Sequence, residues 1–573
     1  MMTFTAAAIQ FEPTLFAKDA NVAALAELVD KAASDGAELI TTPEMATTGY
    51  CFHDHEEAAT VVEQIPGPTT DTFVEIASRR DCYIVLGMPE VDPTSGLFYN
   101  SAILIGPQGI IGTHRKTHPY IAEPKWAAPG NLGHQVFETR LGRIALLICM
   151  DLHFVETARV VALQGADVIC HISNWLAERT PAPYWISRAF ENNCYVIESN
   201  RWGLERTVQF SGGTCIIEPD GTVTGRIDVG NGIVAAEIDI RRTRACGPTR
   251  RPELYRELQT NTYTWNPLDF FTLYGHSPLP AGHTSAVSVV QCTPGTSIET
   301  NLADIEAWVQ QVSGTADLVV FPELSITGPV SEDRPPRDVA ETVDGSSLTR
   351  IADLAVRHGV SIVVGIAERD ADTDRVYNSA VLIEQDRKCT AYRQIHLSAE
   401  HTSLFDAGDR WVVVDLPMGR VGLLVGNDAL LPESGRVLAL RGCDLVVCPS
   451  ALAGVFVGSH PGTEIPLATE VLTGPDATHW HHMRVRAGEN NVYFAFANVV
   501  DPSRGIAGHS GVFGPDTFAF PRTEALVDGD APGHATSVVD TTNLGGAYPT
   551  NVVRRKDLVL MRQPHHYGIL STA

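Results

Sequence analysis

Short, mostly apolar segments recur along the chain, each bounded by glycine or proline. Examples are residues 84–88, 101–105, 144–148 and 167–172. Continuous apolar runs of this length are typical of strands that are buried on both faces of a sheet. Between them lie longer stretches with helical periodicity. In the first of these stretches, the apolar residues that share one face ahead of Gly36 are Val22, Leu25, Leu28 and Val29. The alternation predicts a layered α/β sandwich.

The sequence also repeats itself. Residues 4–50 and 285–329 both read as strand, helix, strand and a Pro-Glu turn, and the second helix has its own apolar face of Leu302, Ile305, Trp308, Val309 and Val312. Further on, FYNSAILIGPQG corresponds to VYNSAVLIEQDR, and GRIALLICMDL corresponds to GRVGLLVGNDA. A Pro-, Gly- and His-rich connector at Gly275–Ser285 separates the copies. We therefore expect two domains of one kind, at residues 1–275 and 285–573.

Composition and charge exclude several classes of protein. The 573 residues include 42 Lys and Arg against 68 Asp and Glu, and the net charge of −26 disfavours nucleic acids and anionic membranes as partners. A hydrophobic content of 44% is sufficient for ordinary packed cores. The 11 cysteines include no CxxC pair, so we expect neither a disulfide framework nor a zinc knuckle, and a cytoplasmic setting. No basic leader or membrane-length apolar run is present, which predicts a chain that is neither exported nor anchored.

Three polar residues lie at the ends of predicted strands, where ligand sites of α/β sheets gather. They are Glu44, Lys116 and Cys149. Taken singly, each has an ordinary structural interpretation: a solvated turn carboxylate, a surface ammonium and a buried thiol. Their meaning therefore depends on the motifs around them.

Those motifs follow one another in a definite order: TPEMATTGY, HRKTHPY, ICMDLHFVETAR, QGADVICHISNW and RAFENNCYVIESNRWGLE. Over residues 4–260 the chain resembles the nitrilase superfamily of carbon–nitrogen hydrolases. The resemblance implies an α-β-β-α sandwich in each copy and a Glu-Lys-Cys triad at Glu44, Lys116 and Cys149. It places a second glutamate at Glu123, seven residues before Gly130, and implies no metal or organic cofactor.

The chemistry of these residue types agrees with that implication. A thiol of ordinary pKa ~8.5 is mostly protonated at neutral pH, so it needs a base such as Glu44. We also expect the strand-to-helix turn at Cys149 to favour the thiolate, because a helix N-terminus stabilises negative charge. Lys116 and the backbone N–H of Met150 would stabilise the tetrahedral oxyanion. Glu44 would then protonate the departing ammonia or amine and activate water against the thioester, while Glu123 orients the substrate nitrogen.

The second copy lacks most of this set. Glu323 retains the acid, but Gln394 occupies the lysine position and Gly426 the cysteine position. Asp151 and Asp428, each two residues after the nucleophile position, support this alignment. We interpret residues 285–573 as a catalytically inactive copy. Our hypothesis is that it serves as the partner in an intrachain pseudo-dimer, with further homo-oligomers possible, and the alternative is an inert remnant.

The residues after the nucleophile indicate the class of substrate. In related proteins Cys-x-Asp, here Cys149-Met150-Asp151, accompanies amidases and N-carbamoyl hydrolases more often than nitrilases. We predict hydrolysis of a small linear amide, with an N-carbamoyl amine or amino acid, or a nitrile, as alternative substrates. A non-catalytic binding protein is a further alternative. The residues expected to contact the substrate are Met150, His153, Asn174 and Trp175.

Two further features have mainly structural interpretations. The histidine cluster at 479–482 could bind a metal, but no acidic or cysteine partner stands at a recognisable spacing, which favours a helix or loop surface. Arg188 and Glu191 match positions near the family's site, and we expect them to support it rather than react.

Overall fold

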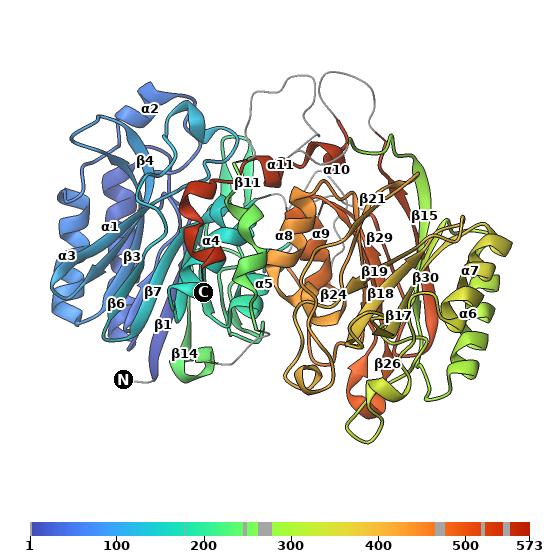
Figure 1. Cartoon of the computed structure of the whole chain (residues 1–573). Coiled ribbons are helices and arrows are strands. Elements are labelled where there is room, and N and C mark those ends of the chain that lie inside the picture. The colour runs from blue at the N-terminus through green and yellow to red at the C-terminus, as the bar shows by residue number, and fades with distance from the viewer. Residues whose placement is uncertain are drawn as a thin grey trace. The chain divides into compact units, whose positions relative to one another are not determined.

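The computed structural model describes residues 3–176, 178–244, 249–261, 278–463, 476–516, 522–542 and 550–572 (Figure 1). The chain forms two compact units, Met1–Cys246 with Phe456–His481, and Gly247–Val455 with His482–Ala573. Each repeat thus supplies most of one unit and a short segment of the other. The domain boundary expected at the 275–285 connector stays a prediction, because residues 262–277 lie outside the described part. Within that part, no helix is long and apolar enough to span a bilayer.

The first unit contains two six-stranded sheets. The first sheet has the order β14 (Gly232–Asp239), β1 (Thr3–Gln10), β2 (Leu39–Thr41), β3 (Tyr83–Val91), β4 (Phe98–Gly106) and β5 (Gly109–Arg115). The second has the order β13 (Val223–Arg226), β12 (Cys215–Ile217), β9 (Tyr195–Asn200), β8 (Val168–Ser173), β7 (Gly142–Ile148) and β6 (Val136–Thr139). Each of the four apolar runs predicted to be strands lies in one of these sheets.

The sheets face each other and helices cover their outer faces (Figure 1). Strands β1 and β9 are in contact, and Thr41 Oγ1 and Ser199 Oγ hydrogen bond across the two sheets at 2.6 Å. Helices α1 (Lys18–Ser34) and α3 (Pro68–Arg80) pack on the first sheet, while α4 (Val155–Leu163) and α5 (Pro183–Asn192) pack on the second. The α-β-β-α sandwich expected from the sequence is therefore confirmed.

The second unit repeats this plan. Its first sheet has the order β19 (Cys389–Arg393), β18 (Val376–Ile383), β17 (Ser361–Arg369), β16 (Leu318–Val320), β15 (Thr284–Gln291) and β30 (Gly533–Asp540). Its second has the order β20 (Val413–Leu416), β21 (Gly419–Leu423), β22 (Leu445–Ser450), β25 (Tyr493–Asn498), β28 (Gly511–Phe513) and β29 (Glu524–Leu526). The helices are α6 (Ile298–Val312), α7 (Ser346–His358), α8 (Pro432–Leu440) and α9 (His482–Asn490).

Burial on the helices follows the predicted periodicity with one adjustment. In α6, Leu302, Ile305, Val309 and Val312 are buried as expected, and Trp308 packs at the margin. In α1 the buried face is centred on Leu25 and Val29, whereas Val22 and Leu28 are only partly buried. Asn21 takes a buried position on that face, because its amide donates to the carbonyl oxygens of Thr14 and Thr47.

The histidine cluster corrects a prediction. Instead of a helix or loop surface, His479 and His481 lie on strand β24 (Asp476–His481), which pairs with β23 (Val457–His460), and both side chains are buried. His479 Nε2 is 2.6 Å from the carbonyl oxygen of Pro181 in the same unit. Among the described residues, no group of three or more His, Cys, Asp or Glu side chains is placed to hold a metal ion.

Candidate active site

Three sequence-predicted polar residues and a second glutamate converge in the first unit. Glu44 follows β2, Lys116 follows β5, and Glu123 begins a single 3-10 turn, Glu123–Lys125. The Lys116 ammonium lies 2.8 Å from Glu44 Oε1 and 2.5 Å from Glu123 Oε2. Cys149 follows β7, and the charges of all three groups act on its thiol. The structure therefore brings the four residues to one place.

Neutral donors hold the two carboxylates in position. The amide nitrogen of Asn100 donates to Glu44 Oε1 at 2.6 Å and to Glu123 Oε1 at 2.8 Å. The Tyr50 hydroxyl donates to Glu123 Oε2 at 3.0 Å, and the backbone N–H of Asn174 donates to Glu44 Oε2 at 2.6 Å. Because hydrogen-bonded buried groups keep a fixed orientation, this network orients both acids toward the lysine.

Sequence reasoning did not single out Asn100 or Tyr50. Asn100 lies in the apolar strand β4 within the FYNSA repeat, and its counterpart in the second copy is Asn378. A polar amide retained in both copies of an otherwise apolar strand was the available signal. Tyr50 ends the motif TPEMATTGY and offers no such pattern, because its partner Glu123 is far along the chain.

Protonation at the site follows from burial and charge. Burial raises the pKa of Glu44, and the Glu123 carboxylate raises it further, while Lys116 opposes both. Burial alone would lower the pKa of Lys116, but Glu123 and Glu44 raise it well above its ordinary value. Lys116 is therefore a permanent cation and cannot act as a base.

The expectation that the turn favours the Cys149 thiolate is wrong. Burial, followed by the Glu44 carboxylate, raises the pKa of Cys149 well above its ordinary value. The helical segment that follows, η2 (Cys149–His153), is a 3-10 helix of only five residues, too short to outweigh those effects. Cys149 has a left-handed φ of 45° and rests as a neutral thiol that needs a base.

Asp151 fixes the turn that carries the cysteine. Its buried carboxylate accepts from the backbone N–H of Ile148 at 3.1 Å and of His118 at 3.0 Å, and contacts His114 Nε2 at 2.8 Å. It also accepts from the Thr117 hydroxyl at 2.8 Å. One carboxylate thus ties the end of β7 to the segment that follows Lys116.

The predicted substrate-contacting residues lie around this centre. His153 stacks on Trp175 with ring centroids 4.4 Å apart, and burial lowers the pKa of His153 well below its ordinary value, so its ring is neutral. The side-chain amide of Asn174 is buried, and neither of its polar atoms has a hydrogen-bond partner among the described residues. Met150, next to Cys149, is half-buried. Unpaired buried amides are rare in proteins and indicate a place for a missing partner.

Arg188 and Glu191 support the site from behind. Arg188 Nε donates to the carbonyl oxygen of Leu152 at 3.0 Å, and its Nη1 lies 2.6 Å from Glu191 Oε1. Arg486 makes the same pair of contacts in the second unit, to Ala429 and Glu489. The repetition in an altered copy indicates a structural role.

A segment of the second repeat packs on the loop that follows β8. Thr463 N donates to the carbonyl oxygen of Thr180 at 2.9 Å, Thr180 N donates to Thr463 Oγ1 at 3.2 Å, and the two hydroxyls are 2.9 Å apart. Arg179 donates to the carbonyl oxygen of Pro461. The loop begins with Asn174, the residue whose N–H holds Glu44, so the segment 456–463 stabilises the backbone next to the candidate site.

The second copy retains the backbone of this site but not its chemistry. Gly426 keeps a φ of 48°, and Val425 N donates to Asp428 Oδ2 at 3.1 Å, as Ile148 N does to Asp151. A Cβ added at Gly426 would stand 2.6 Å from Glu323 Oε2. The alignment of the copies is therefore correct, and the carboxylate occupies space that a nucleophile's side chain would need.

Comparison with known proteins agrees with the repeat. Residues 5–247 and 286–518 both match the profile of the carbon–nitrogen hydrolase family. A nitrilase of Pyrococcus abyssi is 36% identical over an alignment that covers 41% of this chain and 90% of the nitrilase. An (R)-stereoselective amidase of a Pseudomonas species is 32% identical over 36% of this chain and 75% of the amidase. Among solved structures, an amidase from a Nesterenkonia species matches with a TM-score of 0.40 at 24% identity, covering 44% of this chain and 95% of its own. Saccharomyces cerevisiae Nit3, of the nitrilase superfamily, matches with a TM-score of 0.39 at 23% identity, and the match covers 42% of this chain and 92% of Nit3.

Proposed function

Because the chain belongs to the carbon–nitrogen hydrolase family and is an amide-hydrolysing enzyme, we propose that its first copy cleaves small linear amides through a thioester on Cys149. One observation carries this proposal. A buried ammonium, Lys116, bridges two buried carboxylates, Glu44 and Glu123, whose charges reach a neutral thiol. Such a set supplies a nucleophile, a base and a fixed cation within one site.

The first half of the proposed reaction forms the acyl-enzyme. Glu44 takes the thiol proton as Cys149 Sγ attacks the amide carbon, and the carbonyl oxygen becomes an oxyanion. The Lys116 ammonium and the Met150 N–H stabilise that charge, at about 3–4 kcal/mol for a good donor. When the C–N bond breaks, Glu44 returns its proton to the nitrogen, and ammonia leaves.

The second half restores the enzyme. Glu44, ionised again, takes a proton from a water that attacks the thioester carbon. Collapse of this second adduct breaks the C–S bond, and the proton held by Glu44 passes to the sulfur, so a carboxylic acid leaves and the thiol is regenerated. Glu123 positions Lys116 and the substrate nitrogen, which its contacts with Lys116, Asn100 and Tyr50 support.

Two features support an amide as the substrate. Cys149 is followed by Met150-Asp151. The buried Asn174 side chain has a donor and an acceptor that no other described residue pairs with, and they match an amide oxygen and an amide N–H. An N-carbamoyl amine presents the same pair of groups and is the second candidate. The described cysteines are all free thiols, which supports the proposal of a reducing, cytoplasmic setting.

We also propose that the second copy serves the first as a pseudo-dimer partner within one chain. The bonds from Thr463 and Pro461 to the loop at 179–180 support this role, because they come from the second repeat. An inactive second copy can serve in this role, since packing against a partner domain requires no nucleophile.

Ammonia release from aliphatic amides, N-carbamoyl amino acids and nitriles tests the proposal. We expect turnover of amides, its loss by more than about a thousandfold in Cys149→Ala, and little change in Cys82→Ala, a buried cysteine just before β3. Mass spectrometry of rapidly quenched enzyme should show the acyl group on the peptide containing Cys149. Equal turnover by Cys149→Ala, or an acyl group on another residue, would refute the mechanism.

A further inference from the structure

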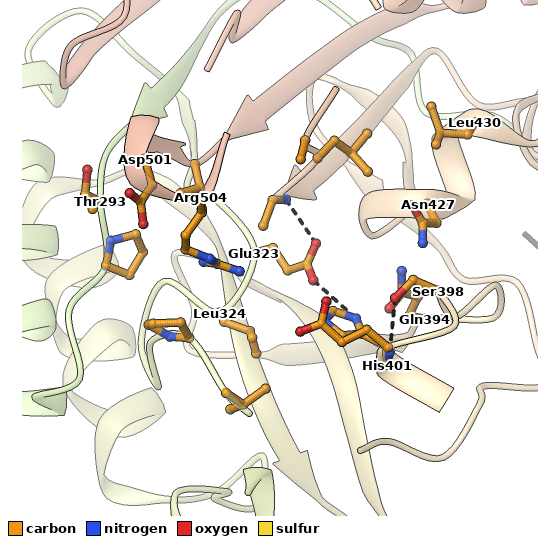
Figure 2. Close-up of a pocket in the computed structure, with 18 residues that line it drawn as sticks. Thr293, Glu323, Leu324, Gln394, Ser398, His401, Asn427, Leu430, Asp501 and Arg504 are labelled. Carbon is orange, nitrogen blue, oxygen red and sulfur yellow. Dashed lines mark hydrogen bonds and ion pairs between the residues drawn. The ribbon is translucent and has the colours of Figure 1, made fainter. Parts of the chain in front are cut away.

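The second unit contains a cavity of about 210 Å³ at the place that corresponds to the first copy's candidate site (Figure 2). Glu323, Gln394 and His401 line it from one side, and Asp501 and Arg504 from the other. His401 lies seven residues before Gly408, as Glu123 lies seven before Gly130. The cavity has therefore kept its acid while its lysine, cysteine and second glutamate became Gln394, Gly426 and His401.

The acid in this cavity has lost its lysine counter-ion, because Gln394 occupies that position. Glu323 is only 4% exposed and accepts from neutral donors, Asn378 Nδ2 at 2.8 Å and Ala451 N at 3.1 Å. Gln394 cannot replace the lysine, because its amide is bonded to Val425 O at 3.1 Å and to Asn378 at 2.9 Å. A buried carboxylate with neutral partners attracts a cationic donor from solution.

His401 offers a second polar atom at the same point. Its Nδ1 is buried, has no hydrogen-bond partner among the described residues, and lies 3.8 Å from Glu323 Oε1. Figure 2 shows the ring beside the carboxylate at the edge of the cavity. A ligand nitrogen bound to Glu323 would lie within reach of this atom as well.

The opposite side of the cavity presents a cation. The Arg504 guanidinium points toward Glu323 in Figure 2, and it forms no ion pair or hydrogen bond with another described residue. Its neighbour Asp501 also lines the cavity, and Oδ1 of its carboxylate accepts from the Ser503 N–H at 3.1 Å and hydroxyl at 2.6 Å. An arginine without a partner beside a cavity is suited to a carboxylate.

We propose that this cavity is a binding site for a small amino acid or related zwitterion, with the ammonium on Glu323 and the carboxylate on Arg504. Its volume equals about seven waters at ~30 Å³ each, which suits a ligand of about six to nine non-hydrogen atoms. The site binds without turnover, because Gly426 supplies no nucleophile. The proposal does not depend on the function proposed for the first copy.

Calorimetric titration of the full chain with 4-aminobutanoate, butylamine and butanoate tests it. We expect 4-aminobutanoate to bind at least tenfold more tightly than either singly charged compound. Glu323→Gln and Arg504→Gln should each weaken that binding at least tenfold. Glu44→Gln, the matched change in the first copy, should leave this binding event intact.

The outcomes separate clearly. No binding of 4-aminobutanoate at millimolar concentration, equal binding of butylamine or butanoate, or indifference to both second-copy variants would overturn the proposal. Circular dichroism and thermal unfolding of each variant report whether it is folded. If Glu323→Gln folds poorly, Arg504→Gln decides, because Arg504 is exposed. Failure of amide hydrolysis in the unmodified chain would count against the proposed function alone.

Discussion

Replacing Lys116 by methionine tests the central feature of the candidate site. The side chain is 1% exposed, and its ammonium is the counter-ion of both Glu44 and Glu123, at 2.8 and 2.5 Å. Methionine keeps the length and removes the charge. Two buried carboxylates would then remain with neutral donors only, among them Asn100.

The expected effect is large. Breaking a buried ion pair by removing one partner costs about 3–5 kcal/mol, and here two acids lose the same cation. For a unit of this size the melting temperature falls by roughly 2 °C per kcal/mol, so we expect a decrease of about 6–10 °C near neutral pH. The loss of the oxyanion donor should also lower kcat by about a hundredfold to a thousandfold.

Calorimetry and ammonia release measure these effects, and the second copy supplies a matched control. Gln394→Met changes the same position, but it removes only neutral hydrogen bonds, at about 1–3 kcal/mol, and should leave kcat unchanged. Adding Glu123→Gln to Lys116→Met should recover part of the stability, because one uncompensated charge disappears. If Lys116→Met is no less stable than Gln394→Met, or the second change recovers nothing, the electrostatic reasoning is wrong.

Three further predictions follow from individual contacts. Burial raises the pKa of Glu44, so kcat/KM should rise with pH through a midpoint above 4.5, the ordinary pKa of a glutamate. Glu123→Gln should move that midpoint to lower pH in a pH–rate profile, and an unmoved midpoint would exclude electrostatic coupling between the two acids. Thr463→Val removes the hydroxyl that hydrogen bonds to Thr180, so we expect the free energy of unfolding in denaturant titration to fall by about 1–3 kcal/mol and kcat/KM to fall several-fold. Unchanged values would show that the segment 456–463 does not stabilise the loop after β8. Burial lowers the pKa of Lys556 from 10.5 to about 8, so between pH 8 and 10.5 this amine binds more protons in the unfolded chain than in the folded one. The contribution of Lys556 to the free energy of unfolding should therefore rise with pH, by at most about 1.4 kcal/mol per pH unit. A Lys556→Met chain whose free energy of unfolding changes with pH by the same amount would contradict this.

Much of the fold could be predicted from local pattern. Strands such as 144–148 and 101–105 are recognisable because burial on both faces requires continuous apolar residues, and α6 because one buried face requires a helical period. The repeat and the motifs around Glu44, Lys116 and Cys149 were sufficient to expect a sandwich of the observed kind.

The partners of those residues were beyond local pattern. Asn100 bridges Glu44 and Glu123, and Tyr50 holds Glu123, through contacts between positions distant in the chain. The histidines at 479 and 481 were expected on a surface but lie buried on a strand, because β24 pairs with β23 and His479 contacts Pro181, which is distant in the chain. Neither contact leaves a periodic mark in the sequence.

The order of residues by itself determined the duplication, the layered architecture and which copy carries a thiol, because these depend on residue identity and short-range periodicity. Only the tertiary structure decided that the pKa of Cys149 lies well above its ordinary value, since that pKa depends on burial and on the nearby Glu44 carboxylate. It also decided that Glu323 and Arg504 face one cavity, because two charges far apart in the chain meet only when the sheets are assembled.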